Sequence, residues 1–113
     1  MAVRVASALD AVVVAKGAPT HVVAPGGATT TIEAATHRLA TAGTGDVLAG
    51  VLAAIVAGSA AFAGAGASLA SMAAEAVELH GHAAALAAAD DRPITALDVA
   101  ERLPAAVAAR LSG

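Results

Sequence analysis

An uncharged stretch from residue 47 to residue 74 occupies the middle of the sequence and limits the folds open to it. The stretch is long enough to cross a lipid bilayer. However, Gly58, Gly64 and Gly66 interrupt it, and its most common residue is alanine, which favours membrane insertion far less than leucine does. We therefore predict two buried helices joined by a glycine-containing loop in preference to a membrane span.

The composition is that of a folded protein with small side chains. Hydrophobic residues make up 58% of the 113 residues and charged residues 13%, which excludes a disordered chain. With one Phe and no Trp or Tyr, the chain lacks the large side chains that usually dominate a core. Because this length is typical of one domain or of part of one, we expect a single unit of low stability.

The charge and the residue types exclude several classes of function. A net charge of −3 provides no basic surface for nucleic acid. The absence of cysteine excludes disulfides, thiolate metal sites and cysteine nucleophiles, and it is compatible with a reducing compartment. The first residues contain no signal-peptide core. We therefore expect a cytoplasmic protein that does not bind nucleic acid.

The N-terminal part of the chain predicts the end of a helix followed by three short strands. Arg4 to Asp10 is predicted to end the helix. Ala11 to Ala15 (AVVVA) is a continuous apolar run of the kind that is buried on both faces of a sheet. Thr20 to Ala24 and Thr29 to Glu33 are rich in β-branched residues and flank a Pro-Gly-Gly turn, so they predict a hairpin. The predicted fold class is therefore α/β.

Two helices and a preceding loop are predicted in the middle of the chain. The loop covers residues 34–44. The first helix opens at Gly45 or Asp46 and ends near Ala57, and the second runs from about Ala67 to Ala89. The Gly/Ser-containing segment between them is the predicted break.

A third helix is predicted at the C-terminal end. Thr95 and Asp98 form a variant capping pair at its start, and Pro104 is expected to kink it. The apolar stripe expected to face the core consists of Leu97, Ala100, Leu103, Val107 and Leu111.

Residues 39–50 (LATAGTGDVLAG) contain the strongest candidate for a functional site. Gly43, Thr44 and Gly45 come where an apolar helix begins, and backbone N–H groups in the first turn of a helix have no partner within it. Together with the helix dipole, these groups predict an anion hole. Asp46 would lie beside it and orient or deprotonate a hydroxyl that attacks a phosphoryl group. Spacing alone leaves open an ordinary Asp helix cap after a glycine turn.

The same segment resembles a family signature. Ala40 to Gly50 (ATAGTGDVLAG) is similar to the A-T-G/A-G-T/S-G-D-V-L-A/S-G signature of the ADP-dependent NAD(P)H-hydrate dehydratases of the ribokinase-like superfamily. Three further motifs occur in the family's order: K-G-A-P-T at residues 16–20, L-H-G at residues 79–81, and T-x-x-D-x-x-x-x-L-P from Thr95 to Pro104. The resemblance implies that residues 1–113 are a single partial domain, the C-terminal part of a ribokinase-like fold.

The resemblance also implies an activity and the residues that perform it. The family removes water from hydrated NADH or NADPH: ADP with Mg²⁺ phosphorylates the added hydroxyl, and loss of phosphate restores NAD(P)H and leaves AMP. Asp46 would contact the hydrate and act as the catalytic base. The full-length family form is expected to be a homo-oligomer. The implied ADP-binding residues are Lys16, Gly17, Ala18, Pro19, Thr20 and Gly45.

Two departures from the family pattern bear on activity. Residues 34–38 (AATHR) replace an Asn/Gly-rich segment, and the first half of the family domain is absent. We therefore expect a truncated form that is inactive by itself. Two other functions stay open: a ribokinase-like small-molecule kinase, and a non-enzymatic remnant or small helical membrane-associated protein.

The four histidines predict no metal site. His80 and His82 are two residues apart on a predicted helix, so they point in different directions and cannot chelate one ion. His21 is on a predicted strand and His37 is in the loop. Solvated or packing roles are expected for all four.

Overall fold

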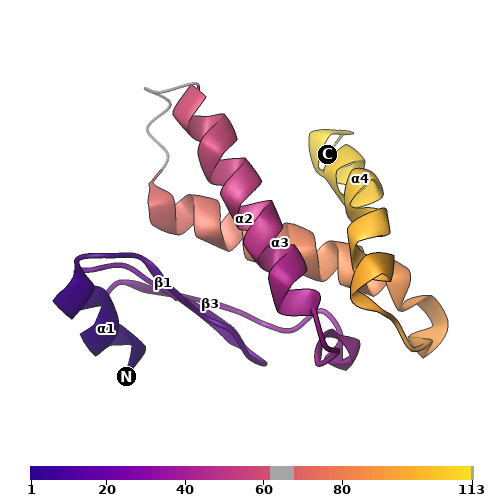
Figure 1. Cartoon of the computed structure of the whole chain (residues 1–113), viewed down its shortest axis with the longest axis horizontal. Coiled ribbons are helices and arrows are strands. Elements are labelled where there is room, and N and C mark those ends of the chain that lie inside the picture. Colours follow the sequence, from indigo (N-terminus) through magenta and orange to yellow (C-terminus); the bar gives the residue numbers. More distant parts are fainter. Residues whose placement is uncertain (62–67, 113) are drawn as a thin grey trace.

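A computed structural model describes residues 1–61 and 68–112. In this part of the chain, three strands and four α-helices confirm the predicted mixed α/β class (Figure 1). The sheet and the N-terminal helix lie at one end of the molecule, beside the three longer helices. The elements are α1 (Ala2–Leu9), β1 (Val13–Ala15), β2 (Thr20–Val23), β3 (Thr29–Ile32), the 3₁₀ helix η1 (His37–Leu39), α2 (Thr44–Ala61), α3 (Leu69–Ala87), the 3₁₀ helix η2 (Ala89–Asp91) and α4 (Ala96–Ser112).

The three strands form an antiparallel sheet in the order β1-β2-β3. Val22 in the central strand pairs with Val14 on one side and with Thr30 on the other, which confirms the predicted hairpin. The first strand is shorter than the predicted Ala11 to Ala15, because the N–H of Ala11 still donates to the carbonyl of Ala6 in α1. Within the described residues, β1 pairs with β2 alone.

The prediction that the first strand is buried on both faces is wrong for this chain. All three residues of β1 are only half-buried. The reason is that β1 is an edge strand and the helix that packs on it, α1, is short. An apolar edge of this kind is open to further pairing.

The uncharged stretch forms parts of two helices, as predicted. The first, α2, continues through Gly58 to Ala61, so its predicted end near Ala57 is wrong. One glycine costs a helix interior only about 1 kcal/mol, which is too little to end a helix of this length. Gly64, Gly66 and the predicted helix start at Ala67 lie outside the described residues. Among the helices that the structure describes, no candidate membrane span is found.

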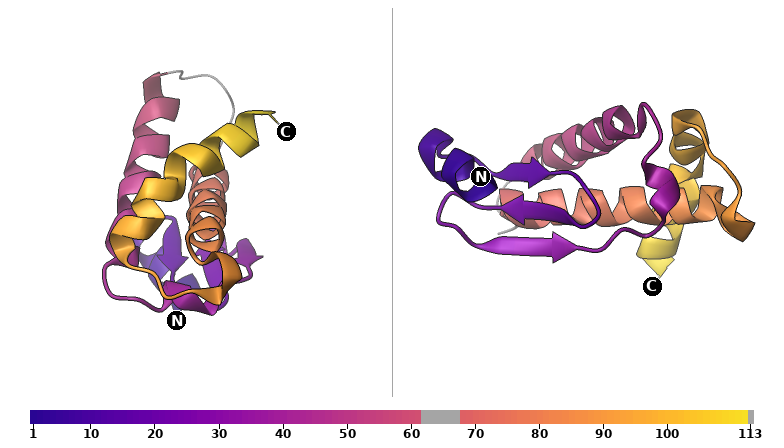
Figure 2. Two further views of the ribbon diagram at one scale, coloured as in Figure 1. Left: turned by 90° about the vertical axis from the view of Figure 1, so that its right-hand side faces the viewer. Right: turned by 90° about the horizontal axis from the view of Figure 1, so that it is seen from below.

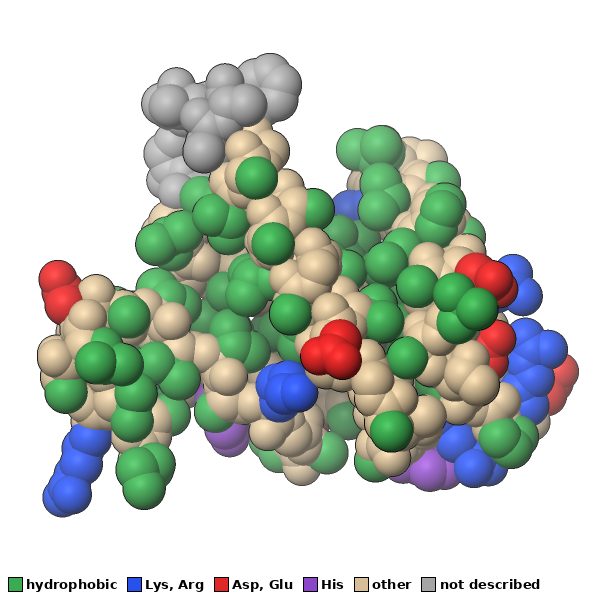
Figure 3. All heavy atoms as spheres, viewed as in Figure 1, with side chains coloured by type: hydrophobic (Ala, Val, Ile, Leu, Met, Phe, Trp, Pro, Cys, Tyr) green, Lys and Arg blue, Asp and Glu red, His purple; other side chains and the backbone are tan. Residues whose placement is uncertain are grey.

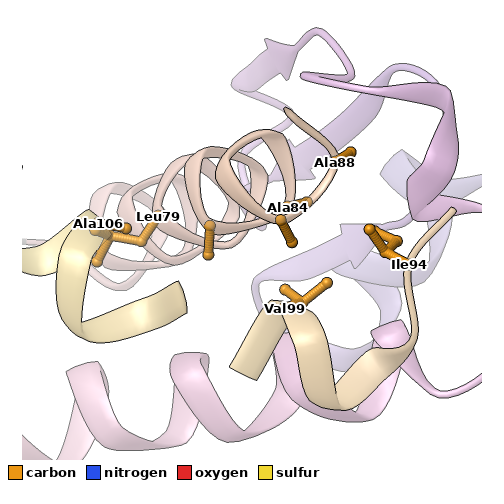
Figure 4. Packing of buried hydrophobic residues seen from close by; sticks show 8 residues of the cluster. Leu79, Ala84, Ala88, Ile94, Val99 and Ala106 are labelled. Carbon is orange, nitrogen blue, oxygen red and sulfur yellow. The ribbon is translucent and has the colours of Figure 1, made fainter. Parts of the chain in front are cut away.

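The central element is α3, which contacts β2 and β3 on one side and α2 and α4 on the others (Figure 2). Ser68 caps its start by accepting a hydrogen bond from the N–H of Ser71. Small residues along its buried side let the neighbouring helices approach closely. Figure 4 shows Leu79 and Ala84 of α3 meeting Ile94, Val99 and Ala106 between α3 and α4.

The last helix begins at the predicted capping pair. The N–H of Asp98 donates to Thr95 Oγ1 over 3.2 Å, and the N–H of Thr95 donates to Asp98 Oδ2 over 2.8 Å. The hydrogen bond that the carboxylate accepts from the N–H of Thr95 is the main cause of the lowered pKa of Asp98, and the Thr95 side chain lowers this pKa further. The helix runs through Pro104 as one element.

The apolar stripe predicted for α4 is wrong. Val99 and Ala106 are buried, whereas Leu97 and Leu111 are 65% and 83% exposed. The helix is turned so that its small residues face the alanines of α3, because close helix packing leaves no room for leucine there. Leu103 alone of the predicted leucines packs against the core.

Removing the hydroxyl of the capping pair should destabilise the fold. We expect Thr95→Ala to lower the free energy of unfolding by about 1 kcal/mol, because the N–H of Asp98 loses its acceptor. Urea unfolding followed by circular dichroism measures this, and Thr95→Ser, which keeps the hydroxyl, is the matched control. Equal stability of the Ala and Ser variants would contradict a stabilising cap.

Candidate active site

The first turn of α2 is held in place by Thr44. This buried residue directs its hydroxyl toward the carbonyls of Leu39 and Thr41, at 2.7 and 2.9 Å. The preceding Gly43 has a φ of 88°, which an L-residue rarely adopts, and a Cβ atom there would lie only 3.1 Å from Cβ of Ala96. The sequence therefore needs glycine at 43 to turn the chain into the helix.

The backbone at Gly45 keeps a donor available. The N–H groups of Asp46 and Val47 both donate to the carbonyl of Gly43, at 3.1 and 3.3 Å. The N–H of Thr44 donates to the carbonyl of Thr41. Within the described part of the chain, the N–H of Gly45 has no such backbone acceptor. This is the donor that a bound anion would accept from.

Lys16 brings a positive charge to the same turn. A Cβ atom on Gly45 would collide with Lys16 Nζ, so glycine at this position lets the ammonium group approach the helix backbone. In residues 1–61 and 68–112, Lys16 forms no ion pair. An ammonium group beside the positive end of a helix dipole is unfavourable by itself. The arrangement is therefore suited to an anion that contacts both groups.

A cavity of about 410 Å³ opens beside Lys16 and Gly45. This volume is typical of small-molecule sites. Its walls come from the turn after β1, the segment from β3 to η1, the first turn of α2, and α3. Most of its lining side chains are apolar or small, and the charged or titratable exceptions are Lys16, Glu33, His37 and His80. The apolar wall consists of Ile32, Ala34, Ala35, Leu39, Leu48 and Val77.

The structure brings together most of the residues predicted to bind ADP or an anion, but not all of them. The turn after β1 is closed by Thr20, whose hydroxyl donates to the carbonyl of Gly17 over 2.9 Å. Asp46 is exposed on the first turn of α2 and does not line the cavity. The predicted residues that line it are Lys16, Gly17, Ala18, Thr20, Thr44 and Gly45, and those that do not are Pro19, Gly43 and Asp46.

The 3₁₀ helix η1 forms one wall of the cavity, although none of its residues was among the predicted binding residues. Arg38 holds it in place by donating from Nε to Oδ1 of Asp91 over 3.2 Å and from its terminal nitrogen to the carbonyl of Asp91 over 2.9 Å. Asp91 lies in η2, far along the chain, so no local pattern reveals this pair. The same segment carries the departure from the family's Asn/Gly-rich sequence.

His80 is a further residue that the sequence did not assign to the site. It lies on the buried side of α3, lines the cavity and donates from Nε2 to the carbonyl of Thr44 over 2.9 Å. Burial lowers the pKa of His80, the hydrogen bond to Thr44 opposes this, and the charge on Lys16 lowers it further. Its spacing of three residues from Val77 and four from Ala84 was the available signal, since it places the histidine on the core side of the helix.

These features define a candidate anion-binding site in a mixed α/β protein. The chain matches the family model of the NAD(P)H-hydrate dehydratases (Carb_kinase) over residues 1–105, and it belongs to this family. No curated protein and no solved structure matched the chain.

Proposed function

We propose that this chain provides the ADP site and the catalytic base for dehydration of hydrated NADH or NADPH. The observation that carries the proposal is the meeting of Lys16 Nζ, the N–H of Gly45 and the cavity at the start of α2. An ammonium group and a helix N-terminus bind phosphate oxygens. The apolar wall beyond them suits a planar base.

The proposed reaction has two steps. The hydroxyl oxygen of the hydrate attacks the terminal phosphorus of ADP, the bond from this phosphorus to the bridging oxygen breaks, and AMP leaves. Asp46 accepts the hydroxyl proton. In the second step the C–O bond to the new phosphate breaks and the neighbouring carbon loses a proton, which restores the double bond of the nicotinamide ring and releases phosphate. Lys16 and the first turn of α2 stabilise the charge on the transferred group.

Mg²⁺ fits this site as a companion of the nucleotide. In the described residues, no group of three or more acidic or histidine side chains is placed to hold a metal ion. Magnesium sites in phosphoryl-transfer proteins commonly use one or two carboxylates together with phosphate oxygens. Asp46 is the carboxylate of this chain on the first turn of α2, and the phosphates would supply further ligands.

We further propose that the hydrate is held partly by protein outside these residues, either further chain or another subunit. Asp46 is exposed, and the cavity does not reach it. The edge of β1 is unpaired within the described residues, and Leu9 on α1 is 70% exposed. On the face shown in Figure 3, most charged side chains gather toward one side, over the end of α3 and the start of α4, and much of the remainder is hydrophobic.

The proposed ADP site can be tested by calorimetry with the chain itself. We expect ADP to bind. We expect Lys16→Ala to lower the affinity for ADP by about tenfold or more, because a charge-assisted hydrogen bond to phosphate is lost. Adenosine, which has no phosphate, should bind both forms equally. Arg4→Ala on α1 removes the same charge away from the cavity and is the matched control.

Two results would contradict the proposal. If ADP binds no better than adenosine, the phosphate site is absent. If hydrated NADPH is consumed with ATP and not with ADP, the protein is a dehydratase of different nucleotide specificity; if another hydroxyl compound is phosphorylated and the hydrate is not, it is a kinase. Either outcome contradicts the proposed reaction. Recovery of reduced-nicotinamide absorbance after addition of hydrate, ADP and Mg²⁺ is the corresponding measurement.

A further inference from the structure

A buried histidine contacts the site from a distant part of the chain. His80 is 6% exposed and comes from α3, 36 positions after Thr44. Its Nε2 lies 2.9 Å from the carbonyl oxygen of Thr44. A carbonyl oxygen accepts hydrogen bonds and cannot donate them, so Nε2 carries the proton in this contact. The described residues contain few buried polar side chains, and His80 and Thr44 are two of them.

The carbonyl that His80 contacts belongs to the same peptide unit as the N–H of Gly45. A trans peptide is planar, and its C=O and N–H bonds point in opposite directions. Whatever fixes the direction of the Thr44 carbonyl therefore fixes the direction of the Gly45 N–H. This N–H keeps no backbone acceptor among the described residues, and Lys16 Nζ lies where a Cβ atom of the same glycine would be.

The Thr44 carbonyl also begins the hydrogen-bond ladder of α2, whose first residue is Thr44, so His80 adds a second donor to it from outside the helix. The hydroxyl and the N–H of Thr44 bind carbonyls in the preceding loop, so they hold the side chain and the peptide before it. A hydrogen bond at the carbonyl also polarises the amide and strengthens its N–H as a donor. The contact from His80 therefore acts on the backbone donor that would face a bound anion.

We propose that His80 is a positioning residue of the anion site: through the Thr44 carbonyl it orients the N–H of Gly45 toward a phosphate group bound beside Lys16. This inference deepens the proposed function, because the phosphate of ADP is the ligand that would use the donor. Burial and the charge on Lys16 both lower the pKa of His80. The neutral ring thus orients the peptide unit between Thr44 and Gly45 and adds no charge to the site.

Two substitutions separate orientation from packing. Gln places its amide nitrogen near the position of His Nε2, whereas Asn places it near Nδ1. We expect His80→Asn to weaken inorganic pyrophosphate binding by about three- to tenfold, as for loss of one neutral hydrogen bond, and His80→Gln to bind within about twofold of the unchanged chain. The amide resonance of Gly45 should shift on addition of pyrophosphate in the unchanged chain and in His80→Gln, and much less in His80→Asn.

The unchanged chain provides a test that needs no variant. Nitrogen-15 NMR should show His80 as the tautomer protonated at Nε2. The Nδ1-protonated tautomer would overturn the inference, and so would equal pyrophosphate affinity and equal Gly45 shifts in His80→Asn and the unchanged chain. If pyrophosphate and ADP do not bind at all, but the Gly45 amide still differs between His80→Asn and His80→Gln, the orientation by His80 stands and the proposed nucleotide function fails.

Discussion

The substitution Asp46→Asn is expected to lower the rate of hydrate dehydration by about 10² to 10⁴, the usual loss when a general base is removed. Asn keeps the size of the side chain and removes its ability to accept a proton. Because Asp46 is exposed on the first turn of α2, the fold should tolerate the change. Binding of ADP without Mg²⁺ should change little, since Asp46 does not line the cavity. The measurement is the initial rate of NADPH recovery, compared with ADP affinity from calorimetry.

The rate loss must be separated from a general effect of removing a negative charge. Glu101→Gln, at an exposed position on α4, removes the same charge away from the site and should leave the rate unchanged. The assay uses the chain itself or, if it does not turn over alone, the chain completed by the N-terminal half of another family member. Near-normal turnover by Asp46→Asn would show that another group accepts the proton.

The parts of the fold that depend on neighbouring residues could be predicted from the sequence. The capping pair Thr95 and Asp98 is three residues apart, and both of its hydrogen bonds are present. The hairpin follows from β-branched runs around a Pro-Gly-Gly turn. These elements are determined by local hydrogen bonds and backbone preferences, which a linear pattern contains.

The parts that depend on contacts between distant residues could not be predicted. The buried face of α4 was predicted from leucine spacing. The small residues of α3 determine which face of α4 packs against them, so Val99 is buried and Leu97 is not. Glycine at 58 gave a local signal to end α2, and the length of the helix outweighed it. The pairing of Arg38 with Asp91 joins residues 53 positions apart.

In the candidate site, too, features set by neighbouring residues could be predicted and those set by distant contacts could not. The motif around Gly43, Thr44 and Gly45 indicated an anion site, and the structure places Thr44 and Gly45 at the cavity. The approach of Lys16 Nζ to Gly45 depends on how the sheet packs against the helices, so spacing alone gave no sign of it. That approach also gives Gly45 two separable roles, one in admitting the ammonium group and one in donating its N–H.

Gly45→Ala should weaken ADP binding without lowering the stability of the fold. Alanine is the better helix former, by up to about 1 kcal/mol, so we expect stability to be unchanged or slightly raised. The added methyl group collides with Lys16 Nζ, which lies at the end of a flexible side chain and can move away. The ammonium group then loses its place at the helix terminus. We expect ADP affinity to fall by about tenfold to a hundredfold, the range for a lost charge-assisted contact.

A double-mutant cycle with Lys16→Ala shows which role of Gly45 is responsible. If the methyl group acts by displacing the ammonium group, Gly45→Ala will weaken ADP binding in the unchanged chain and have little further effect once Lys16 is alanine. If it acts by blocking the N–H of Gly45, the loss of affinity will be the same in both backgrounds. Calorimetric titration of the four proteins with ADP gives the coupling, and urea unfolding of each gives the stability. Unchanged ADP affinity in Gly45→Ala would show that the phosphate is not bound at this helix terminus.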